Sequence, residues 1–206
     1  SLEKILRTRF EDELAGSDVL VTGYGNIGSS TAAAAQGRNA TVMVYDTDPR
    51  RSIEAALDGY HVRERERMLR QADIVIGTTG QQSVDIDDMR SMEGTVILAS
   101  GSSKQREFDI ERLRREASLK DSGSHWEEYQ LDGTSIILLN GGKPVNFLDQ
   151  SISMPILDMI FASLVTCIHE AVQHELQPGL QEPDQERLDS IAETWLHAYQ
   201  YSGELQ

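Results

Sequence analysis

Three closely spaced glycines in the stretch LVTGYGNIGSS (20–30) suggest the most specific chemistry in this chain. Gly23, Gly25 and Gly28 fit the pattern G-x-G-x-x-G. In that pattern the first glycine permits a sharp turn, the second lets the backbone approach a pyrophosphate, and the third lets a helix pack closely on a strand. The spacing therefore predicts a dinucleotide site, provided that a strand precedes the glycines and a helix follows them.

The sequence on both sides of the glycines meets that condition. SDVLVTG (17–23) is typical of a short strand, and IGSSTAAAAQG (27–37) has the small residues of a helix that packs closely on a sheet. The free N–H groups and the positive dipole end of such a helix face a pyrophosphate. The alternative is a tight turn in a domain that binds no phosphate.

An acidic residue lies where such a site needs one. Asp46 ends the apolar run TVMVYD (41–46), 18 residues after Gly28, and an acid at about this distance accepts hydrogen bonds from the adenosine ribose. Because a carboxylate there repels the 2′-phosphate of NADP, NAD is the predicted cofactor. Arg50 and Arg51 lie near enough in sequence to reach such a phosphate, but solvated arginines are common at the start of a helix.

Other groups give weaker signals. GTTG (77–80) follows a predicted strand at the edge of the sheet where ligands bind, so its hydroxyls suit a wall beside the second ribose, or else form a plain turn. His169 and His174 in HEAVQH lie roughly 140° apart on a helix, too divergent for one zinc ion. The charged stretch 63–67 is interpreted as a solvated helix face. No metal site is predicted.

The elements that must position these residues alternate along the chain. Strands and helices follow one another from residue 17 to residue 117, which predicts an α/β fold with a doubly wound Rossmann-type parallel sheet and C-terminal helices. The helix after Asp48 has this residue as its expected N-cap, Pro49 at its first position and Gly59 as its stop. SIILLN (135–140) predicts an added hairpin or crossing strand.

Residues 1–176 are predicted to form the dinucleotide-binding domain, with an amphipathic helix over 2–15 at its start. Residues 177–206 are then a linker and a last helix. The run PILDMIFASLVTCI (155–168) is shorter than the roughly 20 residues that cross a bilayer. It is interpreted as part of a buried helix over 155–176, so no membrane partner is predicted. Because a helix apolar nearly all round needs burial on more than one side, it is expected to form a homo-oligomer contact.

Composition narrows the partners further. The net charge of −15 repels a phosphate backbone, which argues against nucleic acid. The single Cys167 cannot form an intramolecular disulfide and is interpreted as a buried thiol, which fits a reducing cytoplasm. The first ten residues, SLEKILRTRF, lack the apolar core of a signal peptide. Their lack of an initiating Met leaves open whether the sequence is a piece of a longer protein.

Several segments together resemble one family. VTGYGNIGSSTAAA, VMVYDTDPRRSIEAALDGY, IVIGTTG, FDIERL and SIILLNGGKPVNF occur in the order found in the cofactor domain of S-adenosylhomocysteine hydrolase (adenosylhomocysteinase). In that family a tightly bound NAD oxidises a ribose 3′-hydroxyl, which permits elimination of homocysteine and addition of water. The resemblance implies a place in one-carbon metabolism. It implies these cofactor-binding residues: Gly23, Gly25, Asn26, Ile27, Gly28, Asp46, Thr47, Thr78, Thr79, Gly80 and Asn146.

The sequence departs from the family pattern near the family's active centre. Ala99-Ser100-Gly101-Ser102 replaces Asn-Ile-Gly-His, and SISMP (151–155) replaces a Gly-His-Pro-Ser loop, so both family histidines are missing. The family's substrate domain has no counterpart in these 206 residues, and its C-terminal Lys/Tyr tail has no clear one in 184–206. No catalytic residue is assigned.

Three hypotheses about function follow. In the first, the chain is the cofactor half of a hydrolase-like enzyme that does not hydrolyse on its own, and the substrate domain is absent or lies on a separate polypeptide. The second is a divergent NAD-dependent enzyme that acts on another nucleoside or a small alcohol. The third is a regulatory module without enzymatic activity that senses NAD or NADH.

Overall fold

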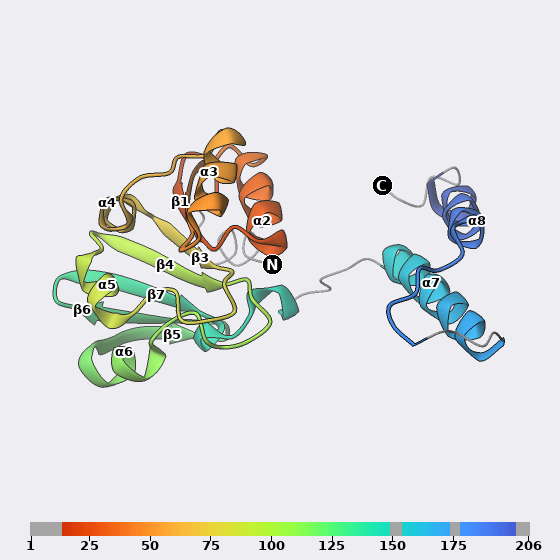
Figure 1. The fold of residues 1–206 in the computed structure, drawn as a ribbon. Helices are drawn as coiled ribbons and strands as arrows, with labels where there is room; N and C mark the ends of the chain where they lie inside the picture. Colours follow the sequence, from red (N-terminus) through yellow and green to blue (C-terminus); the bar gives the residue numbers. More distant parts are fainter. Residues whose placement is uncertain (1–13, 149–153, 174–177, 201–206) are drawn as a thin grey trace. The chain divides into compact units, whose positions relative to one another are not determined.

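The computed structural model of the protein describes residues 14–148, 154–173 and 178–200. These residues belong to two compact units, residues 1–149 and 150–206 (Figure 1). The division falls earlier in the chain than the boundary after residue 176 that the sequence predicts. The predicted helix over 2–15 lies, apart from its last two residues, outside the described residues.

The first unit is built on a seven-stranded sheet with the order β2-β1-β3-β4-β7-β6-β5. Strands β2, β1, β3, β4 and β7 are parallel to one another, and β6 and β5 continue the sheet in antiparallel pairing. The strands are β1 (Asp18–Thr22), β2 (Thr41–Tyr45), β3 (Ile74–Gly77), β4 (Thr95–Ser100), β5 (Ser118–Gly123), β6 (Trp126–Leu131) and β7 (Thr134–Leu139). The predicted doubly wound α/β fold is confirmed, and so is the hairpin at SIILLN.

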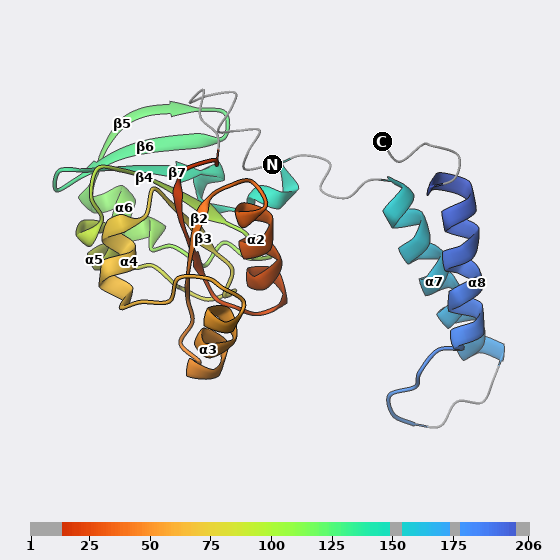
Figure 2. The same cartoon turned by 90° about the horizontal axis from the view of Figure 1, so that it is seen from above.

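Helices cover both faces of this sheet. Those on one face are α2 (Asn26–Gln36) and α3 (Pro49–Leu57), and those on the other are α4 (Arg65–Gln71), α5 (Ile86–Ser91) and α6 (Ile110–Glu116). Figure 2 shows α2 on the opposite side of the sheet from these last three helices. Two 3-10 turns, Asn140–Gly142 and Val145–Phe147, follow β7.

The parallel strands β1, β2, β3, β4 and β7 are mostly apolar because both faces of this part of the sheet are covered, whereas the edge strand β5 is exposed along its length. Val19 and Val21 lie in the core cluster beneath α2 and α3, whereas Leu20 between them lies in the cluster beneath the other three helices. This alternation repeats along β2, β3, β4 and β7. Because a core covers each face of these parallel strands, their ends are the places left to build a site.

Local signals in the sequence set the ends of α3. The carboxylate of Asp48 accepts a hydrogen bond from the backbone N–H of Arg50, Pro49 is the first helical residue, and Gly59 takes a φ of +93° just after the helix. After α3 the chain pairs with β2 only through a single parallel bridge between His61 and Met43. Little chain remains for a longer strand because α4 begins at Arg65.

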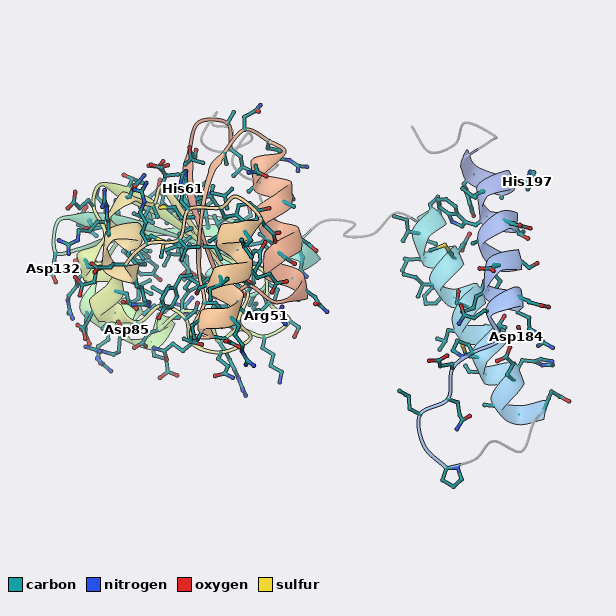
Figure 3. All side chains as sticks on the ribbon, turned by 45° about the horizontal axis from the view of Figure 1, so that its top comes forward. Arg51, His61, Asp85, Asp132, Asp184 and His197 are labelled. Carbon is teal, nitrogen blue, oxygen red and sulfur yellow. The ribbon has the colours of Figure 1, made fainter. Side chains whose placement is uncertain are left out.

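The second unit is a helical hairpin. It consists of α7 (Met154–Gln173) and α8 (Gln185–Trp195), which ends in a π-helical turn over Leu196–Gln200. The indole Nε1 of Trp195 donates to the carbonyl oxygen of Pro155, and Arg187 lies 3.8 Å from Glu170. In Figure 3, Asp184 marks the start of α8 and His197 lies in the π-helical turn. Because α7 packs on α8, the helix that the sequence assigned to the first domain belongs to this hairpin.

The prediction that helix 155–176 is buried is wrong for the residues described. No described residue of α7 is buried, and Cys167, expected as a buried thiol, is partly exposed. The hairpin covers one side of α7 only, which leaves Ile160, Phe161 and Leu164 exposed. By length and composition alone, α7 is also long and apolar enough to cross a membrane.

We expect the sheet core to carry the stability of the first unit. Leu98 on the central strand β4 is fully buried, so Leu98→Ala removes buried apolar contacts and should lower the free energy of unfolding by about 2–5 kcal/mol. Leu119 on the edge strand β5 is 58% exposed, and Leu119→Ala should change it by less than about 0.5 kcal/mol. Urea unfolding followed by circular dichroism measures both, and equal losses would contradict this account.

Candidate functional site: a cavity at the carboxyl end of the parallel strands

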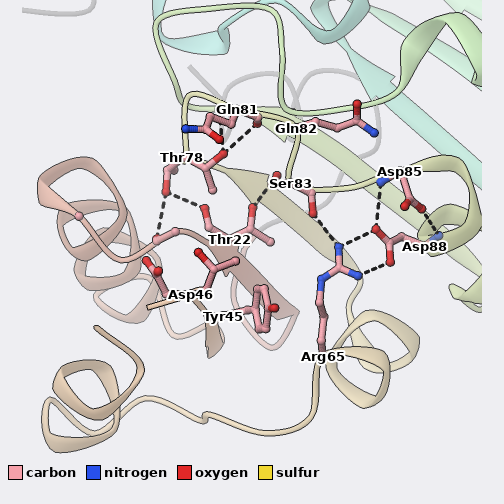
Figure 4. A pocket seen from close by; sticks show the side chains of 14 residues that line it. Thr22, Tyr45, Asp46, Arg65, Thr78, Gln81, Gln82, Ser83, Asp85 and Asp88 are labelled. Atoms are coloured by element: carbon pink, nitrogen blue, oxygen red, sulfur yellow. Dashed lines mark hydrogen bonds and ion pairs between the residues drawn. The ribbon is translucent and has the colours of Figure 1, made fainter. Parts of the chain in front are cut away.

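The carboxyl ends of four parallel strands lie in one row. Tyr45, Thr22, Gly77 and Ser100 are register partners from β2 to β4. The chain leaves β1 toward β2 on one side and later returns to β3 on the other, so the row contains the switch point where ligands bind in sheets of this kind. A cavity of about 640 Å³ opens there (Figure 4). Its lining residues are Thr22, Gly23, Gly25, Tyr45, Asp46, Thr47, Arg65, Thr78, Thr79, Gln81, Gln82, Ser83, Asp85 and Asp88.

The glycine turn joins β1 to α2 at this edge. Gly23 has a φ of +91° and donates from its N–H to the carbonyl oxygen of Tyr45 at 2.7 Å. A β-carbon on Gly28 would lie 2.0 Å from the carbonyl oxygen of Gly23, whereas one on Gly25 would meet no atom within 4 Å. Gly25 is the N-cap of α2 and provides no side-chain cap. The first N–H groups of the helix are therefore available to an anion.

Tyr24, within the glycine turn, ties the turn to its surroundings. Its N–H donates to Oδ2 of Asp46 at 2.6 Å, and its buried phenol donates to Asp58 at the end of α3, also at 2.6 Å. The ring contacts Tyr60 edge-on, with 5.8 Å between the ring centroids. Burial raises the pKa of the Tyr24 phenol, and the hydrogen bond to Asp58 raises it further, so the phenol stays protonated and donates.

The Asp46 carboxylate is fixed by two backbone groups. Oδ2 accepts from Tyr24, and Oδ1 accepts from the N–H of Asp48 at 2.8 Å. The neighbouring arginines do not line the cavity: Arg50 forms an ion pair with Asp48, and Arg51 pairs with Glu54. The guanidinium of Arg50 holds the pKa of Asp48 at about 2. These pairs leave Asp46 as the charged group at the end of β2 that faces the cavity.

A buried carboxylate that sequence reasoning missed shapes the GTTG turn. Glu107 is fully buried, and its Oε1 accepts from the N–H of Gly80 at 2.6 Å while Oε2 lies 2.8 Å from Oγ1 of Thr79. A β-carbon on Gly77 would lie 2.7 Å from the Glu107 side chain. Oγ1 of Thr78 lies 2.9 Å from the carbonyl oxygen of Thr22, which joins this turn to the end of β1. No local sequence pattern marks Glu107.

Arg65 corrects the interpretation of residues 63–67 as a solvated face. Its guanidinium lines the cavity, pairs with the Asp88 carboxylate and donates to the carbonyl oxygen of Ser83 at 2.7 Å (Figure 4). It also lies over the ring of Tyr45, 5.4 Å from the centroid. The hydrogen bonds to Asp88 raise the pKa of Arg65, so it carries its charge at all relevant pH values. The charge alternation of the stretch gives no sign that one arginine turns inward.

The structure brings together part of the predicted site. Gly23, Gly25, Asp46, Thr47, Thr78 and Thr79 line the cavity. The other predicted residues lie beside it: Asn26, Ile27 and Gly28 form the first turn of α2, and Gly80 contacts Glu107. Asn146 is exposed on the 3-10 turn after Pro144, whose backbone bridges Ser100 at the end of β4.

Histidines and metal ligands do not gather at the cavity. The described histidines, His61, His125, His169 and His197, are all exposed, as His61 and His197 in Figure 3 illustrate. Within residues 14–148, 154–173 and 178–200, no three His, Cys, Asp or Glu side chains are close enough to hold a metal ion.

Comparison with known proteins decides the family. Residues 2–151 match the family model of the S-adenosyl-L-homocysteine hydrolase NAD-binding domain. The chain belongs to this family. It is 34% identical over 176 residues to an adenosylhomocysteinase from a Nostoc species, a match that covers 81% of this chain and 41% of that protein. A match to an S-inosyl-L-homocysteine hydrolase from Methanothermobacter thermautotrophicus has 32% identity and covers 81% of this chain and 42% of the relative.

The chain thus spans about two fifths of the length of these curated relatives. Among solved structures, the A chain of dipicolinate synthase from Bacillus subtilis matches with a TM-score of 0.60 and 16% identity, over 82% of this chain and 51% of that one. At this identity the likeness shows the fold alone.

This S-adenosylhomocysteine hydrolase-family domain binds NAD, as its family membership indicates, and its geometry fits the cofactor. The third glycine allows an approach that a β-carbon would block, and the N-terminus of α2 carries no side-chain cap. Both features are those that a bound pyrophosphate requires.

The close approach at Gly28 predicts a large difference between two alanine substitutions in one turn. Gly28→Ala places a methyl group against backbone, so we expect it to lower the free energy of unfolding by about 2 kcal/mol or more. Gly25→Ala meets open space and should change it by less than about 0.5 kcal/mol. Thermal or urea unfolding of both variants checks this prediction. A Gly28→Ala protein as stable as the wild type would contradict the close contact between Gly28 and the backbone of Gly23.

Proposed function

We propose that these residues hold the NAD of an S-adenosylhomocysteine hydrolase-family enzyme and do not hydrolyse a substrate on their own. The observation that carries the proposal is the cavity at the switch point. It combines the glycine turn with Asp46, and no His, Lys or Cys is among its lining residues in the described part of the chain. The groups that bind and transform a nucleoside would come from further sequence of the same protein or from a separate polypeptide.

The residues that line the cavity suggest how the cofactor is held. We assign the pyrophosphate to the turn over Gly23–Gly28, with the N–H groups of Asn26 and Ile27, and the adenosine ribose to Asp46 and Thr47. Thr78, Thr79 and Gly80 would line the nicotinamide half, and Asn146 would lie nearby. When bound, NAD supplies a hydride acceptor.

The carboxylates at the cavity already have partners. Asp46 accepts two backbone N–H groups, Asp85 accepts the N–H groups of Asp87 and Asp88 as the cap of α5, and Asp88 pairs with Arg65. These contacts hold each carboxylate in a fixed orientation toward protein groups. The arrangement therefore suits holding a cofactor better than moving a proton.

The position of the missing family histidine supports the same conclusion. Ser100 and Ser102 are buried, with 3.3 Å between their Oγ atoms, and Oγ of Ser102 donates to the carbonyl oxygen of Lys104 at 2.9 Å. An aliphatic hydroxyl does not titrate near neutral pH, so it cannot take the place of an imidazole as a general acid or base. The other replacement, SISMP, lies mostly outside the described residues.

The proposal predicts binding without turnover. The 206-residue chain should bind NAD in titration calorimetry, and mass analysis of the denatured protein should detect any dinucleotide carried through purification. Incubation with NAD and S-adenosylhomocysteine should release no homocysteine thiol and give no absorbance at 340 nm. Thiol release would contradict the proposal. Reduction of NAD by another nucleoside or a small alcohol would instead support a divergent oxidising enzyme, and an NAD-dependent change of assembly state would support a sensor.

The site assignment predicts a specific loss of affinity. Gly25→Ala should keep the fold but weaken NAD binding about tenfold or more, since its methyl group occupies the space that the phosphates approach. Gln36→Ala, at the exposed far end of α2, is the matched control and should bind NAD as the wild type does. Unchanged NAD affinity in Gly25→Ala would refute the assignment of the pyrophosphate.

We further propose that the exposed face of α7 pairs with a second copy of the chain. Ile160, Phe161, Leu164, Val165 and Ile168 are all exposed at helical spacing, and an apolar stripe of this length is rarely left in water. Leu164→Glu should convert an oligomer to a monomer in light scattering after gel filtration. Leu180→Glu, at a fully exposed position outside both helices, is the control. A monomeric wild type, or a wild type that floats with liposomes, would refute this pairing.

A further inference from the structure

The edges of the Arg65 guanidinium are engaged by protein groups. Nη1 and Nη2 both donate to the carboxylate of Asp88, and Nη2 also donates to the carbonyl oxygen of Ser83 at 2.7 Å. Asp88 is fixed in turn, because its Oδ2 accepts the N–H of Asp85 at 2.9 Å in the capping box of α5. These bonds hold the plane of the guanidinium in one orientation, as Figure 4 shows.

A guanidinium held by its edges presents its flat faces. The Cζ atom of Arg65 lies over the ring of Tyr45, 5.4 Å from the centroid. The side chain nevertheless remains 28% exposed and lines the cavity. Arginine planes stack on aromatic rings and on the bases of nucleotides. The group is therefore suited to contact a flat ring.

The position of this pair selects which ring of the dinucleotide it meets. Tyr45 is the last residue of β2 and directly precedes Asp46, to which the proposed function assigns the adenosine ribose. Both residues line the cavity together with Arg65. The adenine ring is attached to this ribose, whereas the nicotinamide half is assigned to Thr78 and Thr79.

We propose that Arg65 is the adenine-binding residue of this site, with the adenine ring stacked on a guanidinium that Asp88 and Ser83 hold in place against Tyr45. The inference rests on the proposed NAD site and adds a specificity-determining contact to it. Asp88 is a positioning residue, since it acts through Arg65.

Charge favours the adenine ring over a phosphate at this position. The positive charge of Arg65 is already paired with Asp88, and Asp46 and Asp85 add two more carboxylates to the same cavity. A 2′-phosphate would bring up to about two further negative charges into this acidic surface. An uncharged ring takes the stacking contact without that repulsion, so the pair suits NAD rather than NADP.

The test uses the 206-residue chain and titration calorimetry with NAD and ADP-ribose, which keeps the adenosine half and lacks nicotinamide. Arg65→Ala should weaken both ligands by the same factor, about tenfold or more, as expected for loss of one base-stacking contact. Arg65→Lys should lose nearly as much because an ammonium keeps the charge but has no plane. Arg70→Ala, on the same helix and exposed in a pair with Glu66, should bind both ligands as the wild type does.

A further variant separates a lost contact from a damaged fold. Arg65→Ala leaves the Asp88 charge without its partner, so the double variant Arg65→Ala, Asp88→Asn removes that charge and keeps an acceptor for the Asp85 N–H. It should bind as weakly as the single variant while showing a normal unfolding transition.

Unchanged NAD affinity in Arg65→Ala, recovery by Arg65→Lys or by the double variant, or a loss confined to NAD and absent with ADP-ribose would each overturn the adenine assignment alone. A wild-type chain that binds neither ligand would overturn the proposed function itself.

Discussion

The carbonyl oxygen of Gly23 lies where a β-carbon on Gly28 would be only 2.0 Å away, so the first turn of α2 contacts the end of β1 with no room for a side chain. This contact sets the direction of the helix and brings its uncapped N-terminus to the carboxyl edge of the sheet. Tyr24, confined between the glycines, then reaches Asp46 with its backbone and Asp58 with its phenol. The position of the cavity therefore depends on the close contact between the backbones of Gly23 and Gly28.

The electrostatics of the cavity come from partnered groups. The carboxylates at its surface are each tied to backbone N–H groups or to Arg65, and the buried Glu107 holds the GTTG turn from behind. Hydrogen bonds and ion pairs of this kind hold these side chains in fixed positions. A rigid acidic rim next to free helix N–H groups can accept a pyrophosphate in one place and repel an additional phosphate in another.

In the helical hairpin, α8 leaves one apolar side of α7 uncovered. α8 contacts one side of α7 through Trp195 and Arg187, and the opposite side keeps a row of large apolar residues exposed. The sequence shows that α7 is apolar nearly all round. Which of its sides is covered within the chain depends on α8, and the remaining side accounts for the oligomer contact that we propose.

The sequence by itself determined the parts of this protein that depend on short-range patterns. Glycine spacing, the Asp48-Pro49 helix start and the apolar strands predicted the doubly wound sheet and placed Gly23, Gly25, Asp46, Thr78 and Thr79 at one edge. Register made this possible, because parallel strands bring their carboxyl ends together.

Only the tertiary structure decided which polar groups complete the cavity. Arg65 meets Asp88 across 23 residues of chain, and Glu107 meets Gly80 across 27. Nothing in the sequence of residues 63–67 distinguishes Arg65, which turns inward, from its solvated neighbours. Glu107 likewise has the sequence signature of a surface residue, and only its partners in the fold explain its burial. The boundary between the two units lies after residue 149, and not after residue 176 as the sequence predicts, for the same reason: α7 packs on α8 through contacts that no local pattern encodes. Long-range pairing of polar groups depends on how the chain folds back on itself, and the order of residues alone does not specify it.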